Sequence, residues 1–301
     1  MLTKEKPHEL FVLLILNVAV MLWGFSGLFG KVVEADAYNL TFWRMAIACI
    51  ALAGVYFYRH GIGAIQWNKH LAWKNIVCGI LLAVHWVAFF KVIQMSTIAM
   101  AIIFHASFVF LVAVVEPFIV KEKPRMRTVL VAVFGTLALI ITMAFHVGTI
   151  QPLIWVYGVA VSAGYAALAL LNRTILIEED TLDCMTAQFF YGALLLLPLG
   201  LTGVTSFFDL SMISFGKLLI LGVLTTAVGH SIYFWSLRHV SATKASVLTM
   251  MEPAYAILFA VLILGEYPDQ AMFIGAVIVV LCAVTIAFTT VAKALKEDES
   301  L

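Results

Sequence analysis

A few ionisable and aromatic side chains stand inside long apolar stretches of this 301-residue chain. A charge at the centre of an apolar membrane helix costs about 2.5–3.5 kcal/mol on insertion scales, so each such residue needs a function or a partner. Residues of this kind can bind a ligand or carry a coupling proton, and we expect none of them to be catalytic. The candidates are Glu252, His85, His230, His105, Arg44, Trp86, Tyr233 and Ser107.

Glu252 stands near the middle of an apolar run and is followed by Pro253. A proline inside a helix removes one backbone hydrogen bond and leaves a carbonyl free for a ligand or water. One interpretation is a cavity-facing carboxylate that binds a cationic group or a coupling proton. The other is a carboxylate that hydrogen-bonds a neighbouring helix and fixes its packing.

Three histidines lie in apolar runs, and two of them have similar surroundings. His85 and His230 are each followed four residues later by phenylalanine, at Phe89 and Phe234, which lies on the same helix face. An imidazole beside aromatic rings can titrate near neutral pH or stack on a ligand, but it can also be a packing residue. His105 has the same two interpretations.

Arg44 stands about a turn and a half into an apolar run. Its guanidinium could bind a carboxylate or phosphate through two parallel hydrogen bonds. Alternatively, so long a side chain could reach the membrane surface.

The glycines at positions 24, 27 and 30 allow a neighbouring helix to approach closely, or they form a thin wall that a ligand can touch. In the second case Trp86 and Tyr233 would line the cavity.

The composition defines the elements that must position these residues. Hydrophobic residues make up 63% of the chain and charged residues 12%, with a mean hydropathy of +1.06, which is too apolar for a soluble protein. The apolar runs are continuous instead of alternating, which predicts membrane helices and excludes a barrel. A net charge of +1 gives no electrostatic case for a nucleic-acid partner. No metal-ligand spacing and no phosphate-binding loop is present, so we expect no metal, no cofactor and no ATP-driven pump.

Ten runs are long enough to cross a bilayer. They cover residues 10–30, 38–58, 72–95, 98–120, 127–145, 152–172, 185–203, 214–236, 242–263 and 270–291. With the N-terminus inside, 14 of the 18 Lys and Arg residues fall on the cytoplasmic side, three fall outside, and Arg44 lies within a span. This asymmetry predicts an even number of spans and two cytoplasmic termini.

The two halves of the chain resemble each other at an offset of 145 residues. His85-Trp86 aligns with His230-Ser231, and Ser107 takes the position that aligns with Glu252. One residue of slippage later, Glu122 and Pro124 align with Glu266 and Pro268. Because each half holds five spans, the second enters the membrane from the opposite side. We therefore predict an all-α integral membrane fold of ten transmembrane helices in two inverted five-helix repeats, residues 10–145 and 152–291.

Several motifs then carry a resemblance to a known family. The stretch from Leu237 to Ser246, the triplets Met251-Glu252-Pro253 and Leu264-Gly265-Glu266, and Trp23-Gly24 and Phe42-Trp43-Arg44 near the N-terminus are similar to those of EamA-type members of the drug/metabolite transporter superfamily. The likeness covers essentially the whole chain as two EamA repeats. It departs from the family at His105 and Phe108. The resemblance implies transport of small metabolites, often export.

We therefore expect a secondary transporter, and specifically an exporter, of small organic metabolites such as amino acids, working by alternating access in a bacterial inner membrane. Its partners would be a small-molecule substrate, the lipid bilayer and, if transport is coupled, protons. We expect a monomer or a homodimer. The alternatives are an intramembrane enzyme that uses the histidines and Glu252 as acids and bases, and a lipid-flipping or partner subunit. A lateral opening to lipid would distinguish the last of these.

Overall fold

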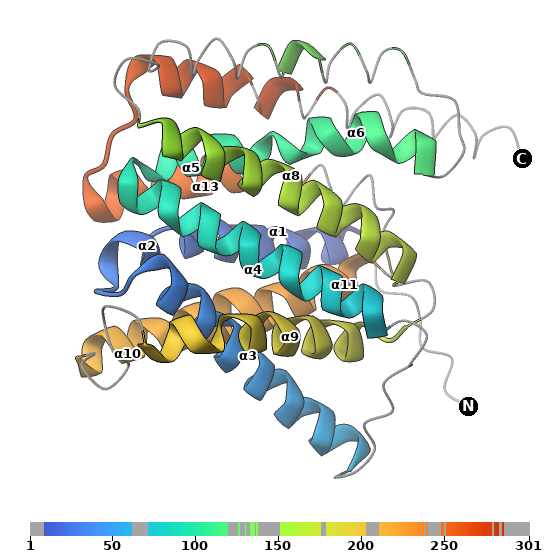
Figure 1. Cartoon of the computed structure of the whole chain (residues 1–301). Helices are drawn as coiled ribbons and strands as arrows, with labels where there is room; N and C mark the ends of the chain where they lie inside the picture. The colour runs from blue at the N-terminus through green and yellow to red at the C-terminus, as the bar shows by residue number, and fades with distance from the viewer. Residues whose placement is uncertain are drawn as a thin grey trace, which may run out of the picture.

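A computed structural model describes residues 9–61, 72–119, 126, 130, 133–135, 137, 151–175, 179–202, 211–237, 239, 248–249, 251–278, 280–282 and 285. Over these residues the chain forms helices, turns and short loops, and no strand occurs among them. The long helices lie side by side as a bundle (Figure 1). This is the fold expected of a chain with continuous apolar runs, because a helix satisfies its own backbone groups in hydrocarbon.

The described helices fall into the two halves of the chain. The first half of the chain contributes α1 (Glu9–Ser26), α2 (Phe29–Val32), α3 (Ala37–His60), α4 (Ala72–Met95), α5 (Ile98–Ala106) and α6 (Phe108–Ile119). The second half contributes α8 (Pro152–Ile175), α9 (Thr181–Thr202), α10 (Met212–Leu219), the π-helix η2 (Ile220–Val228), α11 (Gly229–Leu237), α13 (Glu252–Phe259) and the π-helix η3 (Ala260–Leu264).

Local signals in the sequence set several of these boundaries. The Asp36 carboxylate accepts hydrogen bonds from the backbone N–H groups of Tyr38 and Asn39, which caps α3. Thr97 caps α5 and Ser211 caps α10 in the same way. Such caps satisfy backbone donors that have no partner inside the helix.

Among the residues that the structure describes, seven helical segments are long and apolar enough to cross a membrane. They are Leu10–Val32, Ala37–Arg59, Ala72–Met95, Ile98–Ile119, Pro152–Asn172, Thr181–Leu201 and Met212–Ser236, and they coincide with seven of the ten predicted spans. Glu252–Leu264 and Gln270–Cys282 are shorter apolar helices at the positions of the predicted ninth and tenth spans. The predicted fifth span, residues 127–145, lies largely outside the described residues.

Glycines let the helices approach closely at the centre of the bundle. A Cβ atom on Gly24 of α1 would lie 2.7 Å from Cβ of Tyr255 and 3.0 Å from the backbone nitrogen of Ala256, both in α13. A Cβ atom on Gly79 of α4 would lie 2.6 Å from the carbonyl oxygen of Gln188 in α9. At Gly24 the structure thus agrees with the packing interpretation of the glycine series.

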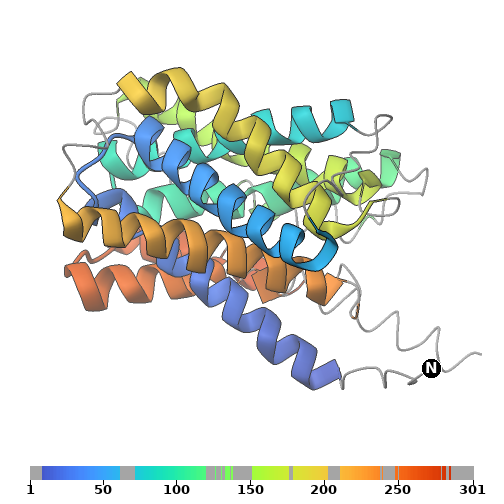
Figure 2. The ribbon, with the colours of Figure 1, turned by 90° about the horizontal axis from the view of Figure 1, so that it is seen from below.

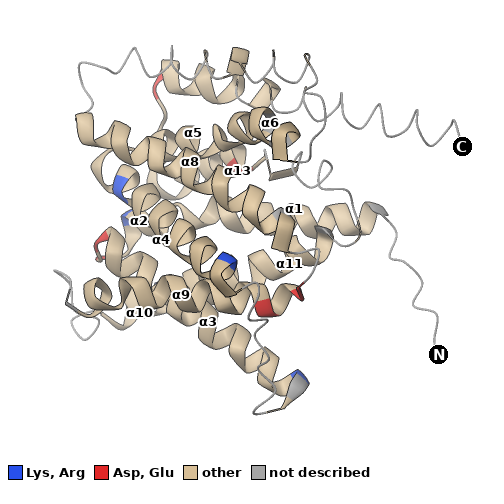
Figure 3. Cartoon of the chain, turned by 45° about the vertical axis from the view of Figure 1, so that its right-hand side comes forward, with Lys and Arg blue, Asp and Glu red and all other residues tan. Residues whose placement is uncertain are grey.

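Not every helix stays against the bundle along its whole length. The C-terminal half of α3 points away from the other helices (Figure 1), and the N-terminal half of α1 does the same in the perpendicular view (Figure 2). Charged residues lie mainly near helix ends, with few in the body of the bundle (Figure 3). A charge in the body of the bundle therefore marks a site that needs an explanation.

Candidate functional site

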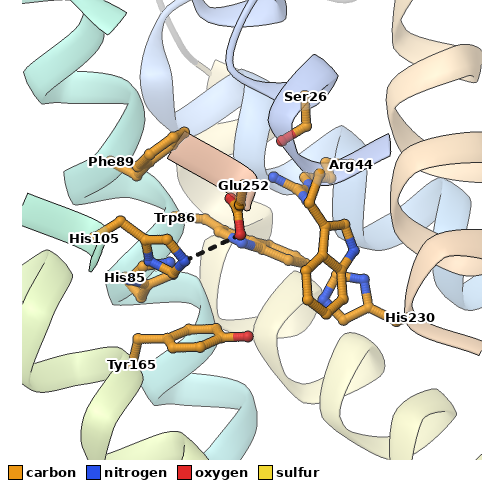
Figure 4. A pocket seen from close by; sticks show the side chains of 10 residues that line it. Ser26, Arg44, His85, Trp86, Phe89, His105, Tyr165, His230 and Glu252 are labelled. Atoms are coloured by element: carbon orange, nitrogen blue, oxygen red, sulfur yellow. Dashed lines mark ion pairs between the residues drawn. The ribbon is translucent and has the colours of Figure 1, made fainter. Parts of the chain in front are cut away.

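A small cavity lies at the centre of the bundle (Figure 4), with space for a few water-sized molecules. The cavity is lined from both halves of the chain by Trp23, Ser26, Arg44, His85, Trp86, Phe89, His105, Tyr165, His230 and Glu252. Six of the eight residues singled out in the sequence are thus brought together here.

Glu252 contributes the carboxylate of the cavity. Its Oε2 atom lies 3.5 Å from Nε2 of His105, and both residues are less than a tenth exposed. Glu252 is the first residue of α13, so Pro253 stands in the first helical turn. A proline there breaks no hydrogen bond, because the first N–H groups of a helix have no internal partner. The expectation that Pro253 interrupts a helix is therefore wrong for the helix that the structure describes.

Arg44 contributes the cation. Its side chain is 2% exposed and stays inside the bundle, so the structure does not show it reaching the membrane surface. The guanidinium carbon lies 3.7 Å from the centroid of the Trp86 ring, and Nε donates a hydrogen bond of 2.8 Å to Oγ1 of Thr226. Among the described contacts, these leave the two terminal amino groups of Arg44 for a ligand in the cavity.

The acceptor for Arg44 comes from a π-helix. The Thr226 hydroxyl donates to the carbonyl oxygen of Leu221 at 2.7 Å and accepts from Arg44, and the Thr226 carbonyl lies 3.0 Å from Nδ1 of His230. π-helical turns are rare and occur often at functional sites. One threonine of η2, Thr226, therefore contacts two cavity residues: its hydroxyl accepts from Arg44, and its carbonyl oxygen lies next to His230.

The three histidines occupy two sides of the cavity. Nδ1 of His85 lies 2.8 Å from the carbonyl oxygen of Val161, and the His85 and His105 rings are 5.1 Å apart. Because a carbonyl can only accept, Nδ1 of His85 carries the proton in this contact. The His230 ring lies 4.8 Å from the Trp23 ring and 5.7 Å from Trp86. His85 and His230, from different halves of the chain, thus line the same cavity.

Two of the predicted residues lie elsewhere. The Tyr233 ring packs against Trp23 at 4.9 Å and joins an apolar cluster with the N-terminal half of α1. The Ser107 hydroxyl donates to the carbonyl oxygen of Phe104 at 2.7 Å and lies 2.6 Å from the hydroxyl of Ser162. Neither residue is among those that line the cavity.

Sequence reasoning missed Tyr165 and Ser26 as cavity residues. The Tyr165 ring lies 4.7 Å from His105 and 4.9 Å from His85, and it closes the side of the cavity formed by α8. The residue that aligns with it in the other half is Val20, so the repeat gives no signal for it. Trp23 belongs to the Trp23-Gly24 motif of the family resemblance and was not predicted to line the cavity.

A second, larger pocket lies near the end of the bundle where α3 leaves its neighbours. Its walls come from α1, α3, α9, η2 and α11 and are mostly apolar. Arg59 and Asp180 stand at one end of it, and Ala227, next to Thr226, forms part of its wall. We refer below to this end of the bundle as the Arg59 end.

A polar cavity enclosed between membrane helices from two halves of a chain is the arrangement of a membrane transporter. Residues 10–144 and 152–288 each match the EamA-like transporter family, and the chain belongs to this family. The prediction of a transporter instead of an enzyme is thereby confirmed.

Proteins similar to this chain are also named as transporters. An uncharacterized transporter of Bacillus subtilis (strain 168) is 25% identical over 273 residues, which cover 87% of this chain and 85% of the relative. The S-adenosylmethionine uptake transporter of Rickettsia felis is 24% identical over 267 residues, which cover 88% and 87%. A protein of known crystal structure shares the fold with a TM-score of 0.66 and 16% identity, over 95% of this chain and 98% of that one.

Proposed function

We propose that the chain is a secondary transporter that exports small organic metabolites such as amino acids, and that the central cavity is its substrate site. The observation that carries this proposal is the pairing in one cavity of a buried cation from the first half, Arg44, with a buried carboxylate from the second, Glu252. Inverted repeats, residues 10–145 and 152–291, would rock about such a central site to give alternating access.

The charges of the cavity favour a zwitterion. A substrate carboxylate can accept two parallel hydrogen bonds from the terminal amino groups of Arg44. A substrate ammonium can pair with Glu252 in place of His105, and Figure 4 shows Glu252 between His105 and Arg44. Both buried charges of the protein then gain a partner, which offsets the desolvation of the substrate. The aromatic rings of Trp23 and Tyr165 remain for its apolar part.

The named relatives add one specific compound to test. The Rickettsia relative is named for uptake of S-adenosylmethionine, which carries an amino-acid end and a flat purine. An amino-acid end would use the same two charges, and the purine would need the aromatic rings.

The orientation and coupling are part of the same proposal. The distribution of Lys and Arg supports two cytoplasmic termini in a bacterial inner membrane, with the chain acting as a monomer or homodimer. The contact between His105 and Glu252 supports protons as the coupling ion, because a carboxylate beside an imidazole can exchange one. A substrate ammonium and a proton would then compete for Glu252.

The test is transport by the purified chain in liposomes. The panel holds amino acids, amines without a carboxylate, carboxylic acids without an amine, and S-adenosylmethionine, each with and without a pH gradient. We expect amino acids to be transported and the compounds that lack one of the two charges to be transported far more slowly. Equal transport of amines and amino acids would contradict the role of Arg44.

Variants of Arg44 make the test specific to the cavity. Arg44→Lys keeps the charge but loses the planar pair of donors, and Arg44→Gln loses both. A hydrogen bond to a charged group contributes about 1.5–3 kcal/mol, so we expect Arg44→Gln to weaken binding of amino acids about 10- to 100-fold, with Arg44→Lys in between. The control is Glu34→Gln, at an exposed acid outside the cavity. Unchanged affinity in both Arg44 variants would remove Arg44 from the site.

A further inference from the structure

The end of the bundle opposite the Arg59 end is held together by a glutamate. Gly265 follows η3 with φ +65°, in the left-handed region that glycine adopts without strain, and turns the chain back on itself. The next residue, Glu266, accepts a hydrogen bond of 2.7 Å at Oε1 from the backbone N–H of Ile98. Ile98 begins α5 and is fully buried. The contact therefore joins the second half of the chain to the first.

The hydrogen bond from Ile98 to Glu266 is stabilised by its position at the start of a helix. The first N–H groups of a helix have no internal partner and carry a partial positive charge, which a carboxylate stabilises. The Thr97 hydroxyl caps the same turn by accepting from the N–H of Met100 at 3.1 Å. It also lies 3.7 Å from the sulfur of Met272, which belongs to the second half. The start of α5 is thus tied to the segment around Glu266 at two points.

The same two segments are tied again in the substrate cavity. His105, near the other end of α5, contacts Glu252 at the start of α13, and α13 continues through η3 to Glu266. The helices therefore run antiparallel, with one acidic residue of the second half at each end of α5. A further contact across the halves lies near the Glu266 contact, where Nζ of Lys217 donates to the carbonyl oxygen of Val32 at 2.7 Å.

We propose that Glu266 is the latch that holds this end of the transporter closed. When a substrate ammonium pairs with Glu252, the contact between His105 and α13 is lost, and the polar contacts of Glu266 and Thr97 then remain at the start of α5. Opening this end requires the carboxylate to leave the N–H of Ile98. The proposal rests on the transport function proposed above, because it assigns the latch to the step that exposes the cavity on the Glu266 side.

The test measures access to the cavity without any substrate. The four native cysteines are replaced, Ser26 in the cavity is changed to cysteine, and the protein is labelled in sealed vesicles of each orientation with a membrane-impermeant thiol reagent. We expect Glu266→Gln to raise the labelling rate from the Glu266 side several-fold and to lower it from the other side, because an amide binds the helix start less strongly than a carboxylate. Glu266→Asp, which keeps the charge, should give a smaller change in the same direction.

The matched control is Glu34→Gln, which removes an exposed charge at the same end without removing the contact with Ile98. If Glu266→Gln labels from the Glu266 side at the same rate as Glu34→Gln, then Glu266 is not a latch. Should Glu266→Gln give little folded protein by gel filtration, Glu266→Asp decides the question in the same assay. Because the readout is access and not transport, a change in labelling supports the latch even if none of the tested amino acids is transported.

Discussion

At the level of single residues, the proposed substrate site depends on one cation and one carboxylate that share a cavity. Arg44 and Glu252 could be selected from the sequence because a charge within an apolar run is costly. The sequence could not predict which residues surround Arg44 and Glu252. The stacking of Arg44 on Trp86 and the contact of Glu252 with His105 join residues far apart in the chain, and no local pattern encodes such contacts.

Thr226 should position Arg44. Thr226→Val removes the acceptor of the 2.8 Å hydrogen bond from Nε of Arg44, so we expect substrate affinity to fall. A hydrogen bond of this kind contributes about 1–1.5 kcal/mol, which corresponds to about 5- to 10-fold in the dissociation constant. Thr225→Val is the matched control, because the described hydrogen bond of Thr225 goes to the Leu221 carbonyl and the one from Arg44 goes to Thr226. Equal affinities in the two variants would refute the positioning role.

Glu252→Gln separates the two uses of the carboxylate. If Glu252 binds the substrate ammonium, as we propose, this variant should lose exchange at equal concentrations and gradient-driven transport together, because an amide cannot form the ion pair. The measurement is the exchange of a labelled amino acid across liposomes compared with its transport under a pH gradient. Loss of gradient-driven transport with intact exchange would instead make Glu252 a proton carrier that does not bind the substrate.

At the scale of helices, the apolar runs and the polar residues between them were sufficient to place seven spans. The π-helix η2 was not predictable, because its sequence is as apolar as that of its neighbours and the extra residue per turn leaves no composition signal. Pro253 misled sequence reasoning because a proline inside an apolar run resembles a helix break, whereas α13 begins just before it. Helix starts without a capping side chain are hard to recognise from sequence.

Gly24 tests how closely α1 and α13 must pack. In Gly24→Ala the new Cβ atom would lie 2.7 Å from Cβ of Tyr255 and 3.0 Å from the backbone of Ala256, so a backbone must shift. Overpacking of this kind costs about 1–3 kcal/mol, and we expect a lower midpoint of thermal unfolding. Gly54→Ala in α3 is the control, because nothing lies within 4 Å of the added atom. Equal midpoints would show that α1 and α13 are not in close contact.

At the scale of the whole molecule, the sequence suggests two repeats that enter the membrane from opposite sides. The presence of His85 and His230 in one cavity is what such repeats would produce, since each half contributes equivalent positions to the centre. In the proposed alternating-access cycle, the larger pocket at the Arg59 end and the contacts at the Glu266 end would belong to a state open at the Arg59 end. No sequence pattern predicts which end is open, because such a cycle would require the same chain to adopt both arrangements.

Single cysteines test the orientation of the bundle. In a chain without native cysteines, a cysteine at Asp269 should react with an impermeant thiol reagent from outside intact cells, and a cysteine at Arg125 should not. The reason is that basic residues are retained on the cytoplasmic side. Labelling at position 125 and not at 269 would reverse the orientation, and the Glu266 end would then face the cytoplasm.

The cavity between the two halves of the chain is proposed to bind the substrate. This binding is tested by substrate protection of a cysteine at Ser26, with the rate of labelling by N-ethylmaleimide as the measurement. We predict that the amino acid transported fastest slows this labelling several-fold at saturation and leaves a cysteine at Ser231, in the wall of the larger cavity, unaffected. Unchanged labelling at Ser26 with protection at Ser231 would contradict the account and place the substrate outside the central cavity.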